Sequence, residues 1–130
     1  MIRKQLTRYL ENRPGVLAKV AASLASARIN IEGISVAASP DVGLVQVIVD
    51  NAAAARKVLK KLGISHTIQD VAMVSVPDRP GALARLAAKI ARAGININYI
   101  YGTACKCKCE CGTSLVVSAA NLKRLAALSR

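Results

Sequence analysis

One segment of the sequence occurs twice, and this repeat constrains the fold more than any other feature. The stretch ENRPGVLAKVAASLASARINIEGISVA, from Glu11, aligns without a gap with PDRPGALARLAAKIARAGININYIYGT, from Pro77. The offset is 66 residues, and both copies carry Arg-Pro-Gly followed fifteen residues later by Asn-Ile. A fixed internal period indicates a repeated structural unit. The 130 residues therefore predict two small units, at 1–70 and 71–130.

The hydrophobic pattern predicts the same order of elements in both copies. Alternating β-branched stretches indicate strands, and apolar residues three and four apart indicate helices. Asn12 and Asp78, just before each Arg-Pro-Gly, are predicted to cap the helices that follow. In the first copy the order is strand, helix, strand, strand, helix, strand, at Gln5–Glu11, Val16–Ala27, Ile29–Ser39, Gly43–Asp50, Asn51–Gly63 and Ile64–Asp70. In the second copy the corresponding elements are Val71–Pro77, Pro80–Ala93, Ile95–Ala104, Thr113–Ala119 and Asn121–Ser129.

This order predicts an α+β fold made of two ferredoxin-like βαββαβ units in tandem. Each unit should have an antiparallel sheet with both helices on one face and with its first and third strands in the centre. The chain has no Trp or Phe, so Ala, Val, Ile and Leu must fill the core and helices can lie close to the sheet. The second copy ends before its last strand, which is either missing or supplied by another segment.

The motifs ENRPGVL and PDRPGAL, each followed by Asn-Ile, resemble the ACT domain, a small-molecule sensor attached to many enzymes of amino-acid metabolism. The resemblance covers nearly the whole chain and implies a stand-alone, non-catalytic tandem ACT protein. It implies an amino acid or related metabolite bound between ACT units, a homo-oligomer such as a dimer, and a partner enzyme or regulator. The ligand-binding residues it implies are Leu10, Asn12, Pro14, Gly15, Val16, Leu17, Asn30, Asp78, Pro80, Gly81, Ala82, Leu83 and Asn96.

The chemistry of these loops suits an amino acid. Gly15 lets a ligand approach the backbone, the amides of the first helical turn can receive a carboxylate, and Asn12 offers both a donor and an acceptor. If the copies pair with pseudo-symmetry, Asn12 faces Asn96 and Asp78 faces Asn30, and the Asn12 site is the better one because Asp78 repels a carboxylate. The alternative is that each Arg-Pro-Gly loop is only a good helix start.

Comparison with the serine-binding ACT proteins refines the expected ligand. Those relatives carry a histidine two positions before the asparagine, where this chain has Leu10 and, in the second copy, Val76. The departure argues against serine and favours a more apolar ligand. Arg13 and Arg79 are expected to point to solvent.

All the cysteines lie in one stretch, CKCKCECG. This stretch lies at a predicted hairpin tip, where the second copy has about four residues more than the first. A straight strand holds alternate residues too far apart to share one metal ion, but a folded tip can bring thiolates together. Soft thiolates favour zinc or copper(I). A thiol-based metal or redox sensor is therefore the alternative function, with unremarkable thiols as the simpler interpretation. The candidate ligands are Cys105, Cys107, Cys109 and Cys111.

The net charge of +12 raises a third possibility, a basic nucleic-acid-binding module. The basic residues are scattered, and no aromatic residues interleave with them, so a solvated surface is the preferred interpretation. The single histidine, His66, has no partner at a diagnostic spacing, and no phosphate loop or carboxylate pair is present, so no enzyme is predicted. Without an apolar run long enough to span a membrane or a signal sequence, the protein is expected in the cytoplasm.

Overall fold

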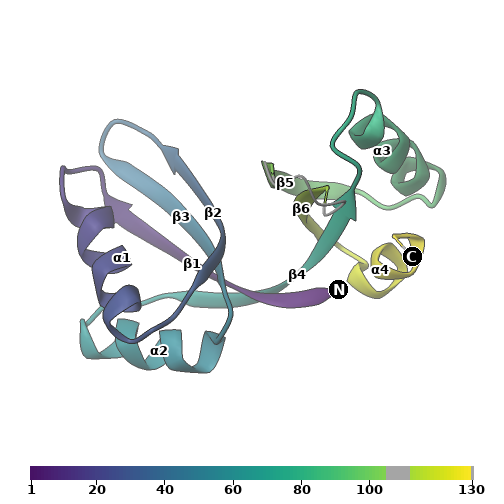
Figure 1. Ribbon diagram of the computed structural model, residues 1–130. Helices are drawn as coiled ribbons and strands as arrows, with labels where there is room; N and C mark the ends of the chain where they lie inside the picture. The colour runs from purple at the N-terminus through teal and green to yellow at the C-terminus, as the bar shows by residue number, and fades with distance from the viewer. Residues whose placement is uncertain (105–111, 130) are drawn as a thin grey trace. The chain divides into compact units, whose positions relative to one another are not determined.

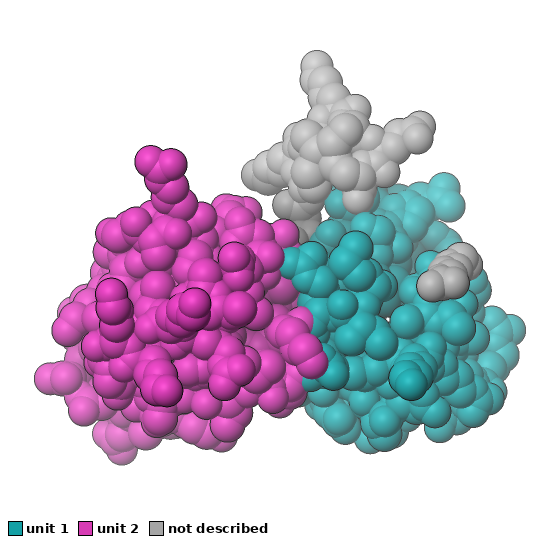
Figure 2. All heavy atoms as spheres, turned by 90° about the horizontal axis from the view of Figure 1, so that it is seen from below, with its two compact units in different colours: residues 1–3, 70–130 teal, residues 4–69 magenta. Residues whose placement is uncertain are grey.

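The computed structural model describes residues 1–104 and 112–129, and these form two compact units. Lys4–Gln69 make up the N-terminal unit, which is magenta in Figure 2. Met1–Arg3 together with Asp70–Arg130 make up the C-terminal unit, which is teal. The units had been predicted at 1–70 and 71–130, so the difference is Met1–Arg3 and Asp70, which belong to the C-terminal unit.

The N-terminal unit has the predicted ferredoxin-like arrangement, with its first and third strands in the centre (Figure 1). Its strands lie in the order β2-β3-β1-β4, and β3 pairs antiparallel with both β1 and β2. Only the first residues of β4, up to Gln69, belong to this unit. The elements are β1 (Ile2–Glu11), α1 (Val16–Ser26), β2 (Ile31–Ala38), β3 (Val42–Val49), α2 (Ala52–Lys61) and β4 (Thr67–Val76).

The core of this unit lies between one face of the sheet and the two helices. Alternate residues of β1 and β3 pair across the strands, for example Leu6 with Val47, and face the helices. Because both helices contribute to the same cluster, both cover the same face of the sheet. The buried cluster consists of Leu6, Val20, Leu24, Ile29, Val45, Val47, Val49, Ala55 and Leu59.

The C-terminal unit repeats this arrangement. Here β6 pairs antiparallel with β4 and β5, and α3 and α4 pack over a second cluster that includes Val74, Leu86, Ile90, Val117 and Leu125. The elements, besides β4 from Asp70 on, are α3 (Ala82–Arg92), β5 (Ile97–Ala104), β6 (Thr113–Ala119) and α4 (Leu122–Leu128).

The structure shows what supplies the last strand of the second copy. Met1 lies beside Met73, and the two residues exchange two backbone hydrogen bonds, of 3.0 Å from the Met1 amino group and 2.7 Å from the Met73 N–H. The first three residues therefore occupy the edge position beside β4 that the sequence left open. The predicted strands Ile64–Asp70 and Val71–Pro77 are in fact one strand, β4, which starts in one unit and continues into the other.

The helix starts differ between the first and the second helix of each unit. Asn51 accepts a hydrogen bond from the Ala54 N–H at 3.0 Å, and Asn121 caps α4 in the same way. Asn12 and Asp78 do not cap α1 and α3 as predicted. The capping positions are Gly15 and Gly81, and no side chain caps either helix, because Arg-Pro-Gly forms a turn of its own before each helix begins.

Candidate functional site

The two Arg-Pro-Gly loops have the same backbone hydrogen bonds. In the N-terminal unit the Arg13 N–H donates to the Glu11 carbonyl and the Val16 N–H donates to the Arg13 carbonyl, at 2.9 and 3.4 Å. The bonds at the corresponding positions of the C-terminal unit are those of Arg79 to Pro77 and Ala82 to Arg79, at 2.9 and 3.2 Å. The repeated sequence therefore builds one loop conformation twice.

Each loop depends on a glycine in the left-handed region of backbone conformation. Gly15 has φ +88° and Gly81 has φ +84°, which residues with a Cβ rarely adopt. A Cβ on Gly15 would meet no atom within 4 Å, so the space beside it is open. The Val16 N–H donates to the Arg13 carbonyl and the Lys19 N–H donates to the Gly15 carbonyl, so Leu17 and Ala18 carry the N–H groups of the first turn of α1 that lack an intrahelical partner. Open space beside exposed donors is what a carboxylate ligand requires.

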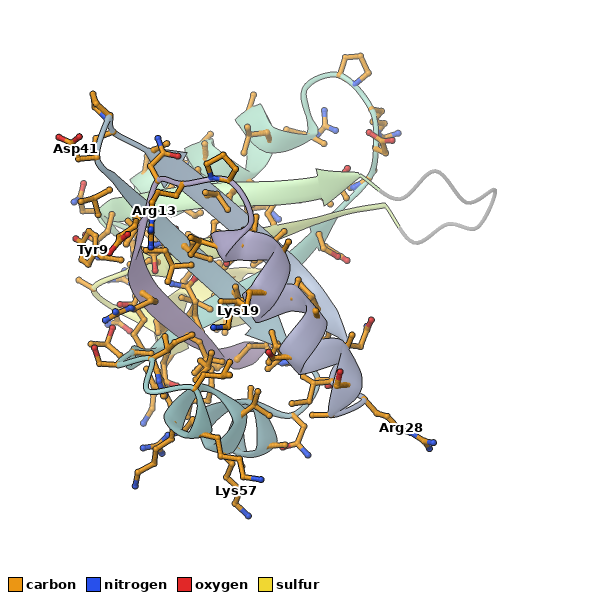
Figure 3. All side chains as sticks on the ribbon, turned by 90° about the vertical axis from the view of Figure 1, so that its left-hand side faces the viewer. Tyr9, Arg13, Lys19, Arg28, Asp41 and Lys57 are labelled. Carbon is orange, nitrogen blue, oxygen red and sulfur yellow. The ribbon has the colours of Figure 1, made fainter. Side chains whose placement is uncertain are left out.

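Asn12 connects this loop to the tip of the β2–β3 hairpin. Its Nδ2 donates to the Ser39 and Pro40 carbonyls at 3.3 and 3.4 Å, and its backbone N–H donates to the Asp41 carbonyl at 3.2 Å. Figure 3 shows the neighbouring Arg13 and Asp41 at the same end of this unit. The amide donors of Asn12 are thus engaged by the hairpin, while Oδ1 remains free to accept a hydrogen bond from an ammonium group.

The hairpin tip was missed as part of the candidate site. A sequence signal for it existed, because β1 and β2 run parallel and their carboxyl ends must lie at the same end of the sheet. The loop after β1 and the turn after β2 therefore meet. In this unit Ser39 also fixes the turn, because its backbone N–H and its Oγ both donate to the Val42 carbonyl.

The C-terminal loop differs in its surroundings. A hollow of about 210 Å³ lies beside the loop and is lined by three cations, Arg79, Arg85 and Lys89, together with Pro77 and Ala82 among others. Arg79 therefore borders a concavity rather than only solvent. Arg13 is 70% exposed and pairs with Glu11 at 2.5 Å, which is an exposed ion pair of small energetic value.

Asn30 and Asn96 lie at the opposite end of their sheets from the loops of their own units. Asn30 precedes β2, and its backbone N–H donates to the Asp50 Oδ1 at 3.1 Å, just beyond the end of β3. Asn96 has the same place before β5, and both residues are exposed. Within one unit, therefore, Asn30 cannot contact a ligand held by Asn12.

The remaining predicted residues divide between the core and the surface. Leu10 and Val76 are half-buried against the cores of their units, on the side that faces the helices. Leu17 and Leu83 are 40% and 50% exposed in the first turns of α1 and α3. The others are Pro14, Gly15, Asp78, Pro80 and Gly81, which are exposed, Val16, which is half-buried, and Ala82, which is buried.

A family model described as an ACT domain pair matches residues 1–121. The chain belongs to the ACT domain pair family. A protein of Bacteroides thetaiotaomicron with a known crystal structure is 31% identical, with a TM-score of 0.87, over 98% of this chain and 86% of that one. The tandem ACT organisation predicted from the repeated motifs is thereby confirmed.

Two solved structures from Thermus share the fold of this ACT pair. The ligand-free regulatory subunit of aspartate kinase from Thermus thermophilus has a TM-score of 0.72 at 18% identity, over 99% of this chain and 93% of that one. The regulatory subunit of aspartate kinase from Thermus flavus has a TM-score of 0.64 at 21% identity, over 98% and 90%. No curated protein matches the chain.

The structure says less about the other features that the sequence singled out, which are the cysteine stretch and His66. Cys105, Cys107, Cys109 and Cys111 lie outside the described residues, so the prediction of a zinc or copper site there remains a prediction. Across residues 1–104 and 112–129, no three His, Cys, Asp or Glu side chains gather as a metal site would require. None of the helices in these same ranges has the length and apolar character of a membrane span. His66 lies just before β4, with Nδ1 at 3.2 Å from the Ile64 carbonyl oxygen.

Proposed function

We propose that this ACT pair is a non-catalytic sensor that binds an amino acid or a closely related metabolite at the loop between β1 and α1. The observation that carries the proposal is the combination found there. Asn12 is held by the hairpin with Oδ1 free, Gly15 leaves open space, and the first turn of α1 is uncapped. These groups match an ammonium, a carboxylate and the Cα between them.

The two loops are not proposed to be equivalent. Asp78 replaces Asn12 in the C-terminal loop, and its carboxylate attracts an ammonium but repels a carboxylate. Leu17, which is 40% exposed beside the N-terminal loop, offers apolar contact to a ligand side chain. The N-terminal loop is therefore proposed as the tighter amino-acid site.

The regulatory role is proposed by analogy. The Thermus relatives are named as regulatory subunits of aspartate kinase, and their likeness to this chain is one of fold. We propose that ligand binding here changes the assembly of the protein, a homo-oligomer such as a dimer, or its contact with an enzyme or regulator of amino-acid metabolism.

Calorimetric titration with each of the twenty amino acids tests the ligand. We expect at least one to bind with a Kd of about 1 mM or tighter. Asn12→Ala should weaken that binding at least about tenfold, because it removes the acceptor for the ammonium group. Asp78→Ala is the matched control and should leave that affinity within about twofold.

Two outcomes would contradict the proposal. One is the absence of binding by all twenty amino acids at millimolar concentration. The other is an amino acid that binds equally well to the Asn12→Ala protein, provided that circular dichroism shows the variant to be folded. Sedimentation velocity with and without the bound amino acid then measures whether binding changes the assembly.

A further inference from the structure

A basic hollow on the N-terminal unit lies away from the loop between β1 and α1. It has a volume of about 540 Å³, within the range of small-molecule sites. Helix α2 contributes one stripe of residues, spaced three and four apart as on a single helical face. The segment before β4 forms the other wall. The lining residues are Ala53, Arg56, Lys57, Lys60, Ile64, Ser65 and His66.

The charge in this hollow is uncompensated. Among the residues that the structure describes, no acidic side chain lines it. In the described parts of the chain, no salt bridge involves Arg56, Lys57 or Lys60, all of which are exposed. Figure 3 shows Lys57 extending away from the body of the unit. Cations placed side by side without counter-charges repel one another, and a bound anion would relieve that repulsion.

The wall opposite α2, the segment Ile64–His66, is held by hydrogen bonds with other groups of the same unit. The Arg8 guanidinium donates through Nη1 to the Ser65 Oγ, so a fourth basic group contacts this wall. The Arg8 Nε is buried and has no hydrogen-bond partner. The contact between the His66 Nδ1 and the Ile64 carbonyl oxygen fixes the orientation of the imidazole ring, and Nε2 takes no part in it. The wall is therefore held in place by contacts from within the unit.

Helix α2 ends beside this hollow in a turn that is closed by backbone hydrogen bonds. The Ile64 N–H donates to the Leu59 carbonyl at 2.9 Å, and the Gly63 N–H donates to the Lys60 carbonyl at 3.1 Å. With Gly63 at φ +69°, this is a Schellman ending, which satisfies the last carbonyl groups of the helix. The carbonyl groups of Leu59 and Lys60 are thus occupied by N–H groups of the chain itself.

The corresponding helix of the C-terminal unit, α4, does not carry the same cations as α2. Counting from the two capping asparagines, Ala126 and Ala127 of α4 stand where Arg56 and Lys57 stand on α2. A hollow of about 660 Å³ lies at that place too, and its described lining residues carry two cations, the Lys123 ammonium and the Met1 α-amino group. Among the described lining residues, α2 therefore contributes three cations to its hollow and α4 contributes one.

We propose that the basic hollow on α2 binds a compact phosphate-bearing anion of the di- or triphosphate class. Arg56 can donate two parallel hydrogen bonds to one phosphate group, while Lys57 and Lys60 act as point charges on the next. The site is confined to one helix and one short segment, which fits a small anion better than the extended backbone of a nucleic acid. The proposal is independent of amino-acid binding at Asn12.

Titration of the full chain with inorganic pyrophosphate and triphosphate, at low and at physiological ionic strength, tests the site. We expect sub-millimolar binding at low salt that weakens as salt rises. Lys57→Glu and Lys60→Glu should each weaken triphosphate binding by about tenfold or more, because each replaces an attraction by a repulsion. Lys61→Glu is the matched control, since it makes the same charge change on the same helix outside the hollow and should cost less than about threefold.

Several results would overturn the proposal. These are no binding of either anion below about 10 mM at low salt, or equal losses for Lys61→Glu and Lys57→Glu in proteins shown to be folded by circular dichroism. Tighter binding of duplex DNA than of triphosphate, with Lys123→Glu as damaging as Lys57→Glu, would instead show a diffuse nucleic-acid surface. Asn12→Ala should leave triphosphate affinity unchanged, so failure of this site and failure of the amino-acid site are distinguishable.

Discussion

The two units differ most at the end of the sheet that carries the Arg-Pro-Gly loop. The N-terminal unit closes its β2–β3 hairpin with a short turn whose carbonyls bind Asn12. The C-terminal unit has a longer connection between β5 and β6, and the chain returns to the sheet through Gly112 at φ +62°. A Cβ there would lie 2.2 Å from the Val76 carbonyl oxygen. The sister position is Val42, which is 41% exposed. The chain at Gly112 therefore lies against the backbone of β4, and this close contact, together with the positive φ, requires glycine.

The largest expected effect on stability comes from replacing Gly112, where the chain re-enters the sheet. Gly112→Ala should lower the free energy of unfolding by about 3 kcal/mol or more, because it combines a disfavoured φ with a clash against backbone. Val42→Ala, at the sister position, should cost about 1 kcal/mol or less, since that side chain is largely exposed. Guanidinium denaturation followed by circular dichroism measures both. A Gly112→Ala protein as stable as Val42→Ala would show that the connection rearranges freely.

A second contrast lies where the first helix of each unit ends. The Ile29 N–H donates to the Leu24 carbonyl, and the Ile95 N–H donates to the Ile90 carbonyl, so α1 and α3 end alike. The left-handed position is Gly94 after α3, at φ +66°, but Arg28 after α1, at φ +56°. The same turn is therefore strained in one unit and relaxed in the other.

Exchanging these residues should move stability in opposite directions. Arg28→Gly is expected to raise the free energy of unfolding by about 1 kcal/mol, because glycine adopts positive φ without steric cost. Gly94→Arg should lower it by about 1 kcal/mol, and no atom lies within 4 Å of the added Cβ to make the change larger. Thermal melting of both variants measures the changes. If both changes had the same sign, backbone conformation would not be the cause.

Much of the fold could be predicted from the sequence because each element predicted in one copy could be compared with the same element in the other copy. Helix and strand signals that are weak alone become reliable when they recur at the same place in a second copy. The strand at Thr113–Ala119 was predicted in this way. The fusion of two predicted strands into β4 had a signal that was overlooked, since residues 64–76 contain no Gly or Pro to break a strand.

Other features could not be predicted because they depend on tertiary contacts. Met1–Arg3 is too short to show a periodic pattern, so its place beside Met73 is visible only in the folded chain. Asn12 is a residue type that is common at helix N-caps, but the turn formed by Arg-Pro-Gly moves the helix start to Gly15. The basic hollow joins α2 to a segment whose position depends on Arg8, from a different strand.

The smallest expected effect concerns the sheet face that looks away from the helices. In the C-terminal unit Tyr99 and Tyr101 stack there, with ring centroids 6.4 Å apart, whereas the sister position of Tyr101 is Ser35. Burial, and to a lesser extent the neighbouring Tyr99, raises the pKa of the Tyr101 phenol well above its ordinary value near 10.

The sign of the pH dependence follows from that direction. The neutral phenol is favoured in the folded state, so its contribution to stability is complete below pH 10 and is lost as the pH rises further. The loss should be at most about 1.4 kcal/mol per pH unit above pH 10, and less to the extent that water reaches the ring. Guanidinium denaturation at pH 8 and pH 11 measures it, and Tyr101→Phe should remove this part of the change. Tyr9→Phe, at a side chain that is 65% exposed in the N-terminal unit, is the control and should leave the loss as it is in the unaltered protein. An identical pH dependence in Tyr101→Phe would mean that the alkaline loss arises elsewhere.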